Sequence, residues 1–204
     1  MKRADEVTNE PAGSSSLSPS AQRLSNYLSA HGILACNLNP YLPALDDIGC
    51  SWSDAMALID SHRLFYCKAF RQRTSYLSPE AYFLLKQCRK PRPMEPGSQA
   101  IYELLLSGPP LDTKALKLFS CLPPKEYTKA FSALLEALAI TALGSGQTLN
   151  PNWSTLVYST ADAWEAFVPA PSSAADPAAV LWHIFSSSML ESDFVRLVGS
   201  VKTK

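Results

Sequence analysis

The chain has 204 residues, with 18 basic and 18 acidic side chains and a hydrophobic fraction of 47%. A chain of this length forms one large domain or two small ones, and this hydrophobic fraction is typical of a globular protein with a packed core. The formal net charge is zero, so the overall charge gives no support to a nucleic-acid binder, which is often strongly basic.

The first helix is marked by its capping residues. Residues 1–17 are polar and can bury little apolar surface, so we expect a disordered tail there. Ser18 and Pro19 are the residue types preferred at an N-cap and at the first helical position, and Gly32 is typical of a C-cap. Together they predict a helix over residues 19–31.

The next part of the chain gives weaker signals. Prolines and asparagines interrupt residues 33–50, and we expect irregular structure there. A short helix begins at Ser51 or Ser53. Residues 64–70 are an almost continuous apolar run that contains one lysine, and its period does not distinguish a helix from a buried strand.

A second Ser-Pro pair begins the next helix. Ser78 and Pro79 predict a helix that continues to about Cys88. Residues 89–97 contain three prolines, which block helix propagation, and this segment is a linker or a domain boundary.

Three helices follow the linker. Ser98 caps a helix that ends at Gly108, Asp112 or Thr113 caps a short second helix, and a third begins after a turn at residues 121–124. The third helix has apolar residues at steps of three and four, which is the pattern of an amphipathic helix. These apolar residues are Tyr127, Phe131, Leu134, Leu135 and Leu138.

Two strands are expected next. Residues 140–143 are apolar, Gly144 and Gly146 follow, and residues 153–158 alternate as a strand does. This order of elements predicts a winged helix-turn-helix with the third helix in the recognition position and residues 144–152 as the wing.

The predicted fold class is therefore α+β, mostly α, in three parts. An N-terminal, mainly helical lobe covers residues 18–95, the winged helix-turn-helix covers 96–168, and a C-terminal helical extension covers 169–204, where Asp176 caps a helix. We expect the first two parts to pack together, because the winged helix alone is too small to cover the apolar residues of the lobe.

The charges are distributed unevenly. Residues 1–60 carry three basic and seven acidic side chains, whereas residues 61–92 carry eight basic side chains and one acidic side chain, Glu80. This basic segment either contacts phosphates or forms a solvated face that pairs with the acidic N-terminal third. Its aromatic residues either stack on bases or belong to the core. They are Tyr66, Phe70, Tyr76, Tyr82 and Phe83.

Few residues suggest catalysis or metal binding. The five cysteines form no C-x-x-C pair, so we expect reduced, mostly buried thiols, and no cofactor or metal. The candidates for acid–base chemistry are the adjacent Asp46 and Asp47, and Asp60 with His62. His31, His183 and Cys67 are better explained by a helix C-terminus or by packing.

Three segments resemble a known bacterial family. They are "LSAHGILACNLNPYLPAL" at 28–45, "RLFYCKAFRQRTSYLSPEAYFLL" at 63–85, and "KEYTKAFSALLEALAITALG" with "NWSTLVYSTADAWEAF" at 125–144 and 152–167. They are similar to the AlkZ-related proteins, relatives of winged-helix alkylpurine and crosslink DNA glycosylases. This resemblance implies a cytoplasmic winged-helix protein with a role on DNA, such as DNA repair.

The glycosylases of that wider group carry a Gln-x-Gln or Gln-x-Asp motif. No glutamine of this chain is followed two residues later by Gln or Asp, so we expect no glycosylase activity of the usual kind. The glutamines are Gln22, Gln72, Gln87, Gln99 and Gln147.

The function that we expect is non-catalytic binding of double-stranded DNA or a protein partner. The competing hypotheses are an enzyme that acts on alkylated or crosslinked DNA with a different site, and a dimerisation or structural module. No segment approaches the ~18 consecutive apolar residues that span a bilayer, so we expect a cytoplasmic protein without a membrane partner. The candidate nucleic-acid-binding residues are Arg63, Lys68, Arg71, Arg73, Lys125 and Lys129.

Overall fold

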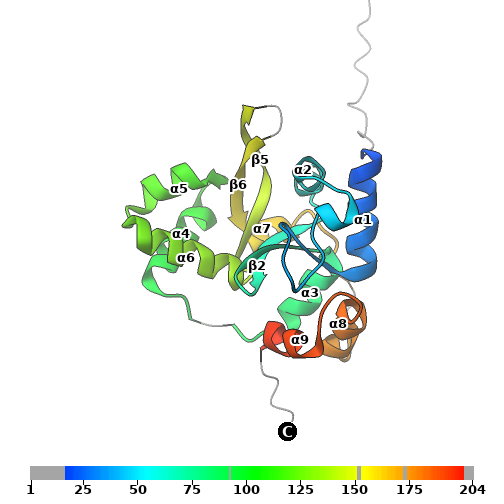
Figure 1. Ribbon diagram of the computed structural model, residues 1–204. Coiled ribbons are helices and arrows are strands. Elements are labelled where there is room, and N and C mark those ends of the chain that lie inside the picture. The colour runs from blue at the N-terminus through cyan, green and yellow to red at the C-terminus, as the bar shows by residue number, and fades with distance from the viewer. Residues whose placement is uncertain (1–16, 92, 151–152, 172–173, 200–204) are drawn as a thin grey trace, which may run out of the picture.

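The fold is α+β, with two small antiparallel sheets surrounded by helices (Figure 1). The computed structural model describes residues 17–91, 93–150, 153–171 and 174–199. The predicted disordered tail therefore lies outside the described residues, except for Leu17, which packs partly buried against the core.

The helices of the N-terminal lobe begin where the sequence predicts. They are α1 (Pro19–His31), α2 (Trp52–Asp60) and α3 (Pro79–Cys88). The Ser18 hydroxyl accepts from the N–H of Ala21 at 3.0 Å, and the Ser78 hydroxyl accepts from that of Ala81 at 3.2 Å. Each cap satisfies a backbone donor that the first helical turn leaves without a partner.

The same lobe contains a three-stranded sheet that the sequence did not predict. Its strands are β1 (Ile33–Ala35), β2 (Phe65–Phe70) and β3 (Arg73–Leu77), in the order β1-β3-β2. The expectation of irregular structure from residue 33 was thus wrong for β1, and the lobe is mixed rather than mainly helical. The apolar run at 64–70 is a strand.

Burial of both faces of this sheet explains the continuous apolar run. Leu34, Tyr66 and Tyr76 belong to a core shared with α1, α2 and residues 101–158. Their strand neighbours, such as Phe65 and Leu77, point into a second core against α3, α7, α8 and α9. A strand buried on both sides has no polar face, so it lacks the alternation that identifies a strand in a sequence.

Residues 96–160 form a second unit of helices and strands. In chain order they are α4 (Pro96–Ser107), β4 (Leu111–Asp112), α5 (Thr113–Ser120), α6 (Pro124–Glu136), β5 (Ile140–Asn150) and β6 (Trp153–Thr160). The sheet order is β4-β6-β5. This arrangement is compatible with the predicted winged helix-turn-helix. The first helix begins at Pro96 rather than after Ser98, since proline is well accommodated in the first turn.

The predicted wing is mostly strand. β5 continues to Asn150, so the glycine-rich segment that we expected to be a loop pairs with β6, with register shifts on either side of Gly144 and Ser145. A Cβ at residue 146 would lie 2.5 Å from Thr155 Oγ1, so any larger residue there would have to displace the Thr155 side chain. Residues 151–152 lie outside the described residues.

The C-terminal part is helical and packs on the first sheet. Its helices are α7 (Ala161–Glu165), α8 (Pro177–Phe185) and α9 (Glu191–Val198). Gly32 ends α1 with a φ of 73°, and a Cβ there would meet the Phe185 ring at 2.5 Å. The absence of a Cβ at Gly32 therefore permits both the positive φ at the end of α1 and the close packing of α8.

The two sheets meet at their edge strands, β2 and β5. The N–H of Tyr66 donates to Thr141 Oγ1 at 3.0 Å, and the Thr141 hydroxyl donates to the carbonyl oxygen of Tyr66 at 2.9 Å. Both groups are buried. The first core extends from Leu24 to Tyr158 across this junction, which confirms that the N-terminal lobe packs on residues 96–160.

Arg89 joins three parts of the chain beside this junction. Its guanidinium donates to the carbonyl oxygens of Ala69 (3.2 Å), Glu136 (2.6 Å) and Leu197 (2.8 Å), at the ends of β2, α6 and α9. One basic residue of the 61–92 segment is therefore part of the internal structure. Among the described residues, no helix combines the length and the apolar character needed to cross a membrane.

We predict that Thr141→Val destabilises the protein. Valine has nearly the same shape but leaves the buried N–H and C=O of Tyr66 without their partner, which costs about 1–3 kcal/mol. Urea unfolding measures the change. Thr128→Val, on the exposed face of α6, is the matched control. A Thr141→Val protein as stable as the wild type would show that the junction does not depend on this pair.

Candidate nucleic-acid interface

The six predicted nucleic-acid-binding residues lie in three places. Lys125, Lys129 and Lys68 lie along α6, Arg71 and Arg73 lie at the turn between β2 and β3, and Arg63 precedes β2 at its other end. A six-residue strand is about 20 Å long, so Arg63 is well separated from the arginines of the turn.

The exposed face of α6 carries the first group. Lys125 and Lys129 are both exposed, and the Lys129 ammonium pairs with Glu95 at 2.7 Å. Lys68 extends from β2 and donates from Nζ to the Ser132 hydroxyl at 3.1 Å. Because residues 125, 129 and 132 follow at helical spacing, these three cations form one row along α6.

The β2–β3 turn carries the second group. Arg71 and Gln72 both have positive φ, 50° and 56°, which is the geometry of a two-residue hairpin turn. Arg71 Nη2 donates to Asp193 Oδ1 of α9 at 2.6 Å, and its guanidinium lies 4.0 Å from the centre of the Tyr41 ring. The Asp193 side chain is only 4% exposed. Arg71 therefore anchors α9, and its guanidinium is engaged by Asp193 rather than available to a phosphate.

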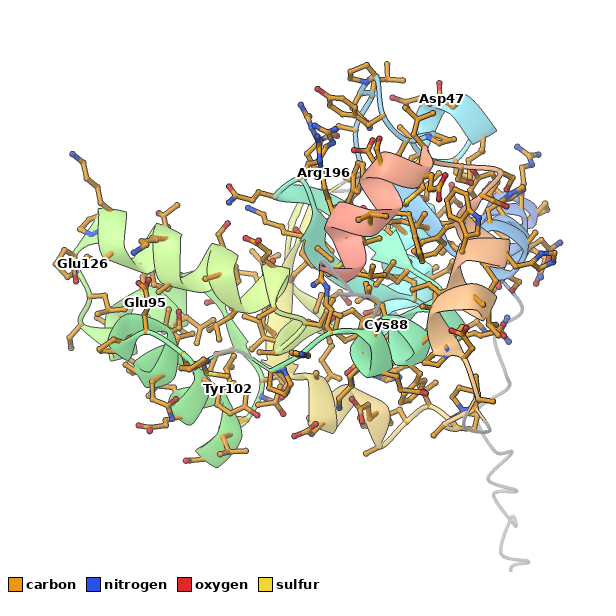
Figure 2. All side chains as sticks on the ribbon, turned by 90° about the horizontal axis from the view of Figure 1, so that it is seen from below. Asp47, Cys88, Glu95, Tyr102, Glu126 and Arg196 are labelled. Carbon is orange, nitrogen blue, oxygen red and sulfur yellow. The ribbon has the colours of Figure 1, made fainter. Side chains whose placement is uncertain are left out.

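Arg73 remains accessible beside it. Its guanidinium lies 5.8 Å from the Tyr41 ring centre and makes no ion pair among the described residues. Arg196 of α9 lies 3.7 Å from Asp193 and is largely exposed. Figure 2 labels Arg196 on α9, and Glu126 marks the first turn of α6. The accessible cations of these elements are therefore Lys125 and Lys129 on α6, Arg73 on β3 and Arg196 on α9.

Arg63 belongs to a different surface. It lines a groove of about 480 Å³ together with residues of α1, the start of α3 and the segment after α7. The neighbouring His62 ring stacks on the Phe167 ring, with centroids 4.2 Å apart and planes 5° apart. The structure therefore does not bring Arg63 together with the other five predicted residues.

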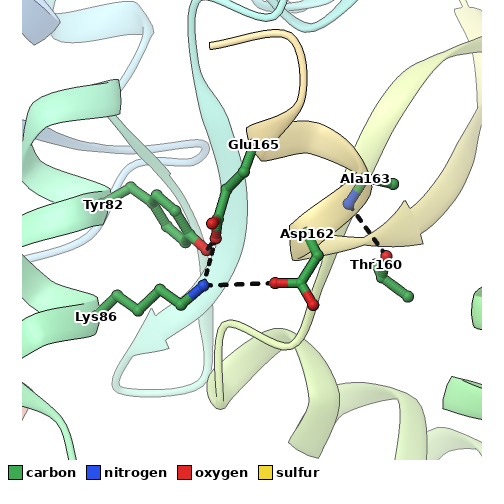
Figure 3. A network of polar contacts seen from close by, with 6 residues as sticks. All are labelled: Tyr82, Lys86, Thr160, Asp162, Ala163 and Glu165. Carbon is green, nitrogen blue, oxygen red and sulfur yellow. Dashed lines mark hydrogen bonds and ion pairs between the residues drawn. The ribbon is translucent and has the colours of Figure 1, made fainter. Parts of the chain in front are cut away.

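Lys86 is held in a polar cluster between α3 and α7 (Figure 3). Its ammonium lies 2.5 Å from Glu165 and 3.5 Å from Asp162, and the Tyr82 hydroxyl donates to the same Glu165 carboxylate. Burial, and then the bond to Glu165, raise the pKa of Tyr82 far above its ordinary value. Partial burial lowers the pKa of Lys86, but Glu165 and Asp162 outweigh it, so the pKa is raised. The cluster fixes α7 on α3.

The residues considered for catalysis have other partners. Asp60 accepts from the N–H of Ser145 at 2.6 Å and ties α2 to β5, and Asp47 accepts from the N–H of Ala44 at 2.8 Å. Neither carboxylate bonds to a histidine among the described residues. Burial raises the pKa of the Cys67 thiol to about 11, which makes the thiolate scarce at neutral pH.

The aromatic residues of the basic segment belong to the core, as the second of the two interpretations proposed. They are Tyr66, Phe70, Tyr76, Tyr82 and Phe83, all buried. Burial raises the pKa of Tyr66 and of Tyr76 above the ordinary value, so both hydroxyls stay protonated. Base stacking on these rings is therefore excluded by their burial.

Comparisons with known proteins assign neither a family nor a function to this chain. A scan against protein-family models, a search of curated proteins and a search of solved structures each found no match to this chain. The AlkZ-related resemblance therefore stays a hypothesis based on the three sequence segments.

Sequence reasoning missed the groove around Arg63. Its residues come from positions 25–29, 61–63, 79–80 and 167–171, which are distant in the chain. The exposed Phe167 was the one signal that could have pointed to it, but an aromatic residue at the end of a helix is usually part of a core, so the sequence alone did not identify it.

We predict that Arg71→Gln destabilises the protein, whereas Arg73→Gln does not. The first change removes the hydrogen-bonded partner of a buried carboxylate and leaves it only the more distant Arg196 among the described residues, which costs about 1–3 kcal/mol, whereas the second removes an exposed cation. Urea unfolding of both variants makes the comparison. Equal stabilities would contradict the role of Arg71 as the anchor of α9.

Proposed function

We propose that residues 96–160, the larger part of the predicted segment 96–168, form a winged helix-turn-helix and that the protein binds the phosphate backbone of duplex DNA without catalysis. The observation that carries the proposal is the Lys68–Ser132 contact, because it joins the basic segment of the lobe to the row of lysines on α6. Lys125, Lys129, Lys68 and Arg73 then form one surface that can replace phosphate counterions.

The outward side chains of α6 favour contact with the backbone over base readout. They include two lysines, two glutamates, Thr128 and Ser132, and no arginine, asparagine or glutamine that could bind a base edge through two bonds. Residues 140–160 contain no lysine or arginine, so the β5–β6 hairpin adds no positive charge. The expected binding is therefore weakly sequence-dependent and sensitive to salt. The AlkZ-related resemblance supports a role on DNA.

Salt dependence of binding tests the proposal. We expect wild-type protein to bind a short duplex, and the triple variant Lys68→Gln/Arg73→Gln/Lys125→Gln to bind less tightly. The slope of log K against log salt should fall in magnitude by about 0.9 for each phosphate that the variant no longer neutralises. Fluorescence anisotropy of a labelled duplex at several salt concentrations gives both quantities.

Arg63→Gln is the matched control, because it removes one cation from a different surface. Its affinity and salt slope should equal those of the wild type. The proposal is wrong if wild-type protein does not bind, or if the triple variant binds as the wild type does. Abasic sites in an alkylated duplex after incubation would instead support the enzymatic alternative.

A protein partner is the second candidate function, and two exposed apolar residues of α5 favour it. Leu118 is 70% exposed and Phe119 is 56% exposed, and Phe119 lines a shallow groove against α4. If this surface mediates dimerisation, wild-type protein has twice the monomer mass in light scattering and Phe119→Ser is a monomer. Monomeric wild-type protein would remove the dimerisation hypothesis.

A further inference from the structure

The groove around Arg63 contains charged groups that have no partner within the described part of the chain. The Arg63 guanidinium makes no hydrogen bond or ion pair there, and the Glu80 carboxylate makes none either, although both line the same groove of about 480 Å³. A guanidinium matches the oxygens of a phosphate or carboxylate, whereas a carboxylate accepts hydrogen bonds from N–H groups. The wall of the groove thus carries a cationic hydrogen-bond donor at one point and an anionic hydrogen-bond acceptor at another.

An aromatic ring completes this arrangement. Phe167 is 60% exposed, and it lines the groove while the His62 ring covers one of its faces in a parallel stack. A large apolar ring with this exposure can receive a planar ligand, which gains energy by stacking. The stack with His62 holds the Phe167 ring in one orientation.

The serine hydroxyls of the groove add acceptors. The Ser29 hydroxyl donates to the carbonyl oxygen of Ser25 at 3.0 Å, and the Ser61 hydroxyl donates to that of Ala57 at 2.8 Å. Since each proton is already used, the oxygen lone pairs are left to accept from a ligand. The acceptors of the groove, with Glu80 among them, therefore favour a ring that carries N–H groups.

We propose that this groove binds a nucleotide whose base carries an exocyclic amino group. Arg63 contacts the phosphate, the base stacks on Phe167, and Glu80 accepts from the amino group. A volume of about 480 Å³ is within the range of small-molecule sites and accommodates one nucleotide. This site is separate from the proposed DNA-binding surface and does not depend on it.

Calorimetric titration with AMP, IMP, adenosine and inorganic phosphate tests the site. We expect AMP to bind to one site per chain, and more tightly than the other three. IMP has an oxygen where AMP has the amino group, adenosine lacks the phosphate, and phosphate lacks the ring. A 5′-phosphorylated oligonucleotide is a further arm: tighter binding than AMP identifies a strand end as the source of the nucleotide, and weaker binding identifies the free nucleotide.

Three variants assign the contacts. Arg63→Gln and Phe167→Leu should each weaken AMP binding by roughly tenfold, as expected when a charged bond or a stacking interaction is removed. Glu80→Gln should remove the preference for AMP over IMP. Arg73→Gln is the matched control and should leave AMP binding unchanged, because it lies at the opposite end of β2–β3.

The proposal is overturned if AMP does not bind at millimolar concentration, or if Arg63→Gln and Arg73→Gln bind it equally. Circular dichroism confirms that each variant is folded. Arg63→Gln is predicted to affect AMP binding and not the binding of a duplex without 5′-phosphates, and Arg73→Gln the reverse. Failure of one proposal therefore does not imply failure of the other.

Discussion

The junction of β2 with β5 is the constraint on which the rest of the structure depends. Thr141 satisfies both backbone groups of Tyr66 in a buried position where water cannot replace it. Arg89 reinforces the junction by bonding to three carbonyl oxygens at the ends of β2, α6 and α9. Because these contacts fix α6 beside β2, Lys68 can reach Ser132, and the two units share one core.

The same arrangement gives the C-terminal helices a structural role. The first sheet has apolar side chains on both faces, and one face is covered by α3, α7, α8 and α9. Arg71 holds α9 from the hairpin turn, and Lys86 holds α7 from α3, so two residues of the basic segment neutralise carboxylates of the C-terminal part. One interpretation of the sequence paired the basic segment with the acidic N-terminal third. Arg71 and Lys86 instead pair with carboxylates of the C-terminal part.

β2 also separates two surfaces that are adjacent in the sequence. Arg63, just before β2, lines a groove beside α1. The other end of β2 leads to the turn beside Tyr41 and α9. An extended strand moves the chain about 3.3 Å per residue, so about eight residues suffice to place two arginines on different faces. A cluster of charges in the sequence is therefore a weak guide to a cluster in space.

The sequence by itself determined where α1, α3, α5 and α8 begin, because Ser18, Ser78, Asp112 and Asp176 cap them through bonds to residues only three positions away. It also predicted the β5–β6 hairpin and the contact between the two units. The sheet of the lobe, the extension of β5 through its glycines and the assembly of the Arg63 groove were decided by the tertiary structure alone. The sheet of the lobe and the groove depend on partners far along the chain, and no local pattern encodes which distant residue a strand or a charge will meet. The extension of β5 depends instead on pairing with the neighbouring strand β6, which outweighs the loop preference of Gly144 and Gly146.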